Sequence, residues 1–92
     1  MRSETVEIFS DQTNAAILRH PDRKFPGVLV QGDSLYQMCQ QADAACKEVG
    51  RGQPGFDVLN DLRNALWLYL THYKVTFLDN GFALPFSEQQ AP

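Results

Sequence analysis

The chain has 92 residues, of which 43% are hydrophobic and 21% charged, and it carries a formal net charge of −3 at pH 7. These values suit one soluble globular domain over residues 1–92 and exclude a disordered chain. The negative charge argues against a protein that holds phosphate backbones, so no nucleic-acid partner is expected. The longest unbroken apolar run, residues 65–70, is six residues. Since a bilayer span needs about 20 and the N-terminus lacks a signal-peptide layout, we expect no membrane contact and a cytoplasmic location.

The first half of the chain predicts a β-β-β-α core over residues 4–49. Residues 5–10 alternate apolar and polar side chains, residues 14–20 form the returning strand after a polar turn, and residues 28–30 are a short β-branched run. Either face of the second strand could be buried, because apolar side chains occur on both. A helix is predicted next, with Ser34 as its cap and Gln37 completing a capping box.

The second half predicts a loop rich in Gly and Pro and then one long helix over residues 56–79, ended by Asn80-Gly81. The spacing of its apolar residues predicts a buried stripe made of Leu59, Leu62, Leu66, Tyr69 or Leu70, Tyr73 and Phe77. The fold class is therefore predicted to be α+β: a three-stranded antiparallel sheet and a first helix, with a second long C-terminal helix packed on the same core. An extended tail, 82–92, follows.

The long helix is apolar nearly all round, so it needs a second covering surface. One interpretation is intramolecular: Trp67 and its neighbours pack on the first helix, on the loop or under the tail. The other is a homodimer or a partner groove at Trp67 and Tyr73, because Trp and Tyr are frequent interface anchors. The sequence leaves both open.

Basic residues cluster once, as Arg19, His20, Arg23 and Lys24, at the end of the second strand and in the loop that Pro21 and Pro26 frame before the third. This loop could be a protein-docking patch, a small anion site or a solvated segment. The predicted partner interface consists of this loop and two residues of the long helix: Arg19, His20, Asp22, Arg23, Lys24, Phe25, Trp67 and Tyr73.

No residue cluster predicts a reaction. Cys39 and Cys46 are seven apart in one predicted helix, about 10.5 Å by the helical rise, which is too far for a disulfide; both are expected in the core. Ser34 lacks the surroundings of a nucleophile elbow, and neither zinc-ligand spacing nor a phosphate-binding loop is present. We therefore expect no catalytic residue, no cofactor and no metal, and a protein that is not an enzyme.

Two resemblances rest on particular stretches of the sequence. Residues 6–49 resemble the strand-strand-strand-helix core of HicB-type antitoxins, through FPGV, VQGDSL and the alanine-rich helix that follows. The whole chain is similar to a family of small uncharacterised bacterial proteins, through VEIF, NAA, RKFPG, VQGDSL and ALPF. The first resemblance implies an antitoxin- or immunity-type protein that masks a toxin. The alternative is a structural or regulatory homodimer built on the long helix, with possible ligand sensing.

Overall fold

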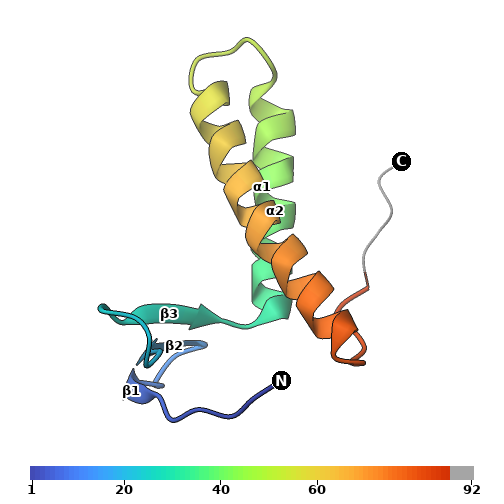
Figure 1. The fold of residues 1–92 in the computed structure, drawn as a ribbon. Coiled ribbons are helices and arrows are strands. Elements are labelled where there is room, and N and C mark those ends of the chain that lie inside the picture. Colours follow the sequence, from blue (N-terminus) through green and yellow to red (C-terminus); the bar gives the residue numbers. More distant parts are fainter. Residues whose placement is uncertain (88–92) are drawn as a thin grey trace. The chain divides into compact units, whose positions relative to one another are not determined.

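The computed structural model describes residues 1–87, in which three strands are followed by two helices (Figure 1). The chain divides into two compact units: residues 1–31 hold the strands, and the second unit, which begins at residue 32, holds the helices. Of the predicted tail, residues 88–92 lie outside the described part of the chain. The predicted α+β class with a three-stranded antiparallel sheet is confirmed.

The sheet consists of β1 (Glu7–Ser10), β2 (Ala15–Arg19) and β3 (Gly27–Val30), paired antiparallel in the order β1-β2-β3. The turn between β1 and β2 is closed by the hydroxyl of Thr13, which accepts from the Ala15 N–H at 3.2 Å and donates to the Ala15 carbonyl at 2.8 Å. Every residue of the central strand β2 is half-buried. Neither of its faces is therefore the sole buried face, which is why alternation alone left this point open.

The helices are α1 (Gly32–Val49) and α2 (Phe56–Asp79). The bounds of α2 agree with the prediction. The prediction for the start of α1 was wrong, because the helix begins two residues before Ser34 and places that residue inside its first turn. The carboxylate of Asp33 accepts from the Ser34 N–H at 2.9 Å. Gly32, the first residue of α1, is buried, and the ring of Tyr73 on α2 packs against it.

The two helices form a hairpin (Figure 1), joined by a loop in which three glycines have left-handed backbone angles. The most buried side chains of the described chain lie in this hairpin: Cys39, Ala42, Cys46, Phe56 and Leu70. Both cysteines are free and buried, as predicted. Neither helix in the described part of the chain is long and apolar enough to cross a membrane.

The predicted stripe of α2 was correct in part. Leu59, Leu66, Leu70, Tyr73 and Phe77 are at least half-buried. Leu62 is 55% exposed, and of the two alternatives Tyr69 and Leu70 it is Leu70 that is buried, while Tyr69 is 66% exposed. At about 100° per residue, the exposed pair lies well round the helix from the line that faces α1.

A Schellman motif ends α2. Gly81 has a φ of 79°, its N–H donates to Leu78 at 2.9 Å, and the N–H of Phe82 donates to Phe77 at 3.2 Å. The rings of Phe82 and Phe77 stack with centroids 5.0 Å apart. Further on, Phe86 stacks on Tyr36 of α1 at 4.5 Å. The described part of the tail therefore docks through its aromatic residues.

Candidate functional site

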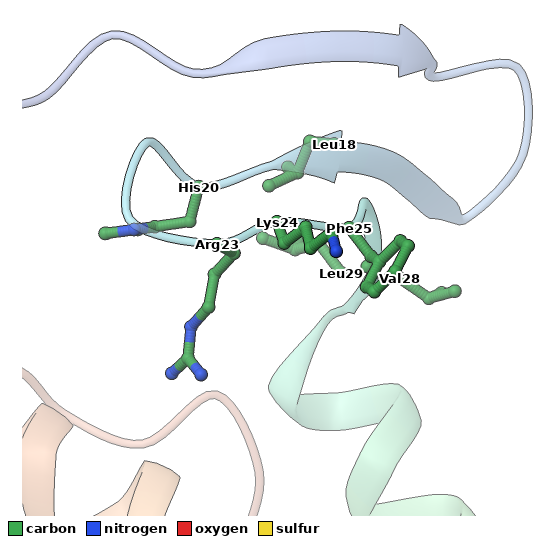
Figure 2. A pocket seen from close by; sticks show the side chains of 8 residues that line it. Leu18, His20, Arg23, Lys24, Phe25, Val28 and Leu29 are labelled. Carbon is green, nitrogen blue, oxygen red and sulfur yellow. The ribbon is translucent and has the colours of Figure 1, made fainter.

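The strand unit has a hollow of about 570 Å³ where β2 leads through its loop into β3 (Figure 2). We call it the β2–β3 hollow. Its volume falls within the range of sites that hold a small ligand or a few side chains of a partner. The lining combines apolar and basic side chains: Leu18, His20, Arg23, Lys24, Phe25, Gly27, Val28 and Leu29.

The strand register explains why this hollow exists. Leu18 pairs with Gly27 across β2 and β3, and Gly27 has no side chain to cover its partner. A Cβ placed on Gly27 would meet nothing within 4 Å. Leu29, two residues on and therefore on the same face of β3 as Gly27, is 49% exposed although it is apolar. Val28, which points to the other face of the strand, is 63% exposed. The missing side chain therefore leaves an apolar floor open beside the loop.

The loop places basic and aromatic groups at the rim of this floor. The N–H of Arg23 donates to the His20 carbonyl at 2.9 Å, which closes a turn with Pro21 at its second position. Nδ1 of His20 accepts from the Asp22 N–H at 3.2 Å. Lys24 Nζ lies 5.4 Å from the centroid of the Phe25 ring, within cation-π range.

Arg23 is the rim cation that is free to bind. Within residues 1–87 its guanidinium forms no hydrogen bond or ion pair, and Figure 2 shows it extending away from the strands. Phe25 beside it is 72% exposed. A cation without a partner next to an exposed ring suits a carboxylate that adjoins an apolar group.

Two residues of the predicted interface have partners elsewhere in the strand unit. Arg19 pairs with Glu7, the residue opposite it in the β1–β2 register. Asp22 lies 3.8 Å from the guanidinium of Arg2 and 4.0 Å from Nδ1 of His20. The structure thus brings His20, Arg23, Lys24 and Phe25 together around the hollow, while Arg19 and Asp22 support the loop from outside its lining.

The two interface candidates on α2 take part in packing within the helical hairpin. The indole N–H of Trp67 donates to Oδ1 of Asp43 on α1 at 2.9 Å. Tyr73 is half-buried over Gly32 and stacks on Phe77 with centroids 5.3 Å apart. For both residues the structure supports the intramolecular interpretation.

The side chains around the hollow are suited to binding. Its lining contains no Ser, Thr or Cys that could act as a nucleophile beside His20. In the described part of the chain, no three His, Cys, Asp or Glu side chains lie close enough together to hold a metal ion. What this arrangement can do is hold an apolar side chain on the floor and a carboxylate at the rim.

The basic residues at the rim of the hollow were predicted from the sequence, and the apolar residues of its floor were not. A basic loop between prolines is visible in the sequence, whereas Leu18 and Leu29 come together on one face only through the strand register. Sequence reasoning also missed an exposed line of α2 that runs through Val58, Leu62 and Tyr69. The signal for this line was present, since its residues recur at spacings of four and seven.

Comparison with protein-family models matches residues 1–86 to DUF6959, described as a family of unknown function. Neither a curated protein nor a solved structure matches the chain. The match confirms the expected similarity to an uncharacterised family. The resemblance of residues 6–49 to HicB-type antitoxins stays a prediction.

Proposed function

The chain belongs to DUF6959, a family of unknown function, and we propose that it is a non-catalytic binding protein that recognises another protein through the β2–β3 hollow. The observation that carries the proposal is the union of an open apolar floor with a rim of two cations and an exposed ring. Such a site takes an apolar side chain with a carboxylate next to it, as on an exposed turn or chain end of a partner.

The hollow can supply the energy of an interface anchor. Fully burying a side chain the size of Leu or Phe is worth about 1.5–3 kcal/mol. A hydrogen bond from Arg23 to a carboxylate adds about 1.5–3 kcal/mol where water is excluded, and less at an open rim. Aromatic and Arg residues are the types that most often act in this way at protein interfaces.

The specific form that we propose is an antitoxin- or immunity-type inhibitor that masks a toxin. The resemblance of FPGVLVQGDSL and its surroundings to the HicB-type core supports it. The net charge of −3 favours encounter with a basic partner such as a nuclease, through steering more than through affinity. The basic hollow would then seat one acidic and apolar feature of that partner and fix the register of the complex.

The test is co-expression with the product of the adjacent reading frame. We expect that product alone to stop growth, and growth to return when this chain is expressed with it and co-purifies. Phe25→Ser removes the exposed ring at the hollow and should abolish both rescue and co-purification. Phe9→Ser is the matched control, because Phe9 is also an exposed strand-unit phenylalanine, at 57%, and does not line the hollow.

Two results would contradict the proposal. If the product of the adjacent reading frame does not stop growth and does not bind this chain, the proposal that the chain masks a toxin is wrong. A complex that survives Phe25→Ser, and also survives Arg23→Glu, would remove the hollow as the binding site. Circular dichroism of each variant shows whether the fold is intact.

A further inference from the structure

The long helix α2 carries two apolar lines with heptad spacing, and only one of them is covered by α1. The covered line steps by three and four residues through Phe56, Leu59, Arg63, Leu66, Leu70, Tyr73 and Phe77, all of them at least half-buried. The second steps by four and three through Val58, Leu62, Ala65, Tyr69, His72 and Thr76, all of them exposed. We call the second line the outer seam.

The outer seam has the exposure of an interface that lacks its partner. Val58 is 76% exposed, Leu62 55% and Tyr69 66%. Apolar residues every 3.5 positions on average are the pattern that a packed neighbouring helix requires. At about 100° per residue, the outer seam lies about 110° round the axis from the covered line. That is close to the angle between the two neighbours of one helix in a four-helix bundle.

The structure also contains a hole that matches this pattern. A hollow of about 380 Å³ on α2 is lined by Tyr69, His72, Tyr73, Thr76 and Phe77. The first four are residues i, i+3, i+4 and i+7, the set that receives one side chain of a facing helix in knobs-into-holes packing. The hole stands at the C-terminal end of the outer seam, whereas the free knobs Val58 and Leu62 stand toward its N-terminal end.

We propose that the outer seam pairs antiparallel with the outer seam of a second copy of this chain. An antiparallel pairing places Val58 of each copy in the hole of the other. The same register places Leu62 opposite Tyr69 and brings the two Ala65 residues together at the two-fold axis. Ala65 is the smallest side chain of the seam, so the helices can approach closely there. The surface is thus self-complementary, as a two-fold interface must be.

The polar groups beside the seam favour the same arrangement. Asp61 flanks the N-terminal half of the outer seam, and His72 lies in its C-terminal half. A parallel pair would bring the two Asp61 carboxylates side by side. The antiparallel pair separates these carboxylates and brings each Asp61 within about one turn of His72 of the other copy, whose imidazole N–H can donate to a carboxylate. It also opposes the two helix dipoles. The occupant that fits is therefore a second α2 in the reverse direction. This inference goes beyond the proposed function and does not rest on it.

Oligomeric state in solution is the first test. Size-exclusion chromatography with light scattering should give twice the 10.4 kDa of the chain. Leu62→Glu places a charge twice in the symmetric interface and should weaken the dimer about a hundredfold or more, so that the monomer dominates. Val75→Glu is the matched control: Val75 is 53% exposed against 55% for Leu62, but it lies off the outer seam and should leave the dimer intact.

Cross-linking tests the direction and the register. Under mild oxidation Ala65→Cys should form a disulfide-linked dimer in high yield. Asn64→Cys, at the exposed neighbour that points about 100° away, should not. Cys39 and Cys46 are 0% and 3% exposed and so contribute little background.

A natural chain that is monomeric at every concentration tested overturns the proposal, because the outer seam is then covered by another part of the same chain or by nothing. A dimer that Leu62→Glu and Val75→Glu leave equally intact also overturns it. A disulfide-linked dimer that forms with Asn64→Cys and does not form with Ala65→Cys excludes the proposed register.

Discussion

Gly32, the first residue of α1, has a close neighbour that its position in a turn-like sequence does not reveal. A Cβ added there would lie 2.5 Å from Cε1 and 2.6 Å from Oη of Tyr73, and closer still to Cζ. Ordinary carbon contacts are about 3.5–4.0 Å, so the overlap is about 1 Å. Gly32→Ala therefore tests whether α1 and α2 meet as described.

The size of the effect follows from two opposed contributions. Ala favours a helix over Gly by up to about 1 kcal/mol. Overpacking of a buried contact costs about 1–3 kcal/mol. Tyr73 cannot easily swing away, because its ring stacks on Phe77 at 5.3 Å and lies 6.4 Å from Phe86. We therefore expect the upper part of the cost and a net loss of about 1–2 kcal/mol in the free energy of unfolding.

Urea unfolding followed by circular dichroism measures this loss, with Gly27→Ala as the matched control. Gly27 has open space for a Cβ and no left-handed angle, so that variant should be neutral or up to about 1 kcal/mol more stable. In a Tyr73→Leu background, Gly32→Ala should lose its cost, because the far end of the ring is gone. If Gly32→Ala stabilises the natural chain, or costs the same in both backgrounds, the contact does not exist as described.

Two further predictions concern side chains inside the helical hairpin. Trp67→Phe removes the N–H that donates to Asp43, whose side chain is 45% exposed. It should therefore lower the free energy of unfolding by about 1 kcal/mol. If the oligomeric state changes and the stability does not, Trp67 is an intermolecular anchor instead. Burial first, and the nearby Asp43 carboxylate second, raise the pKa of the Cys39 thiol above its ordinary value of 9.0. The unfolded chain therefore loses this proton at lower pH than the folded chain, so stability should fall as pH rises above 9. The urea midpoint of Cys39→Ala should fall less at high pH than that of the natural chain. Equal falls in both proteins would show that Cys39 is not the group responsible.

The helix bounds that depend on neighbouring residues alone were predictable from the sequence. The bounds of α2 follow from glycines on either side, since Gly55 precedes it with a φ of 83° and Gly81 ends it with a φ of 79°. The start of α1 was not predictable in the same way. Ser34 is a good cap by composition, but the helix begins at Gly32, where the ring of Tyr73 from the C-terminal part of α2 packs against it. A contact between residues so far apart in the sequence leaves no local signal.

In the candidate site, too, the part that depends on neighbouring residues was predictable and the part that depends on strand pairing was not. The basic rim at Arg23 and Lys24 was predictable, because two prolines and a run of charges mark an exposed loop. The floor was not, because it depends on Leu18 pairing with Gly27, and a shift of one residue would turn Leu18 to the opposite face. That the 19–25 loop belongs to a partner interface stays a prediction, which Phe25→Ser addresses.

The long helix shows why one apolar stripe can be a mixture of two. Starting from Leu59, a step of three leads to Leu62 and a step of four leads to Arg63. A prediction that follows apolar residues selects Leu62, which lies on the outer seam, although Arg63 is the residue on the covered line. Arg63 belongs to the covered line because its guanidinium reaches a polar partner there, with Nε 3.9 Å from Asp43. The charge of Arg63 thus makes the covered line hard to recognise in the sequence, and the apolar Leu62 makes the outer seam look like part of the covered line. The excess of apolar residues on α2 is then the sum of two interfaces, of which the hairpin uses one.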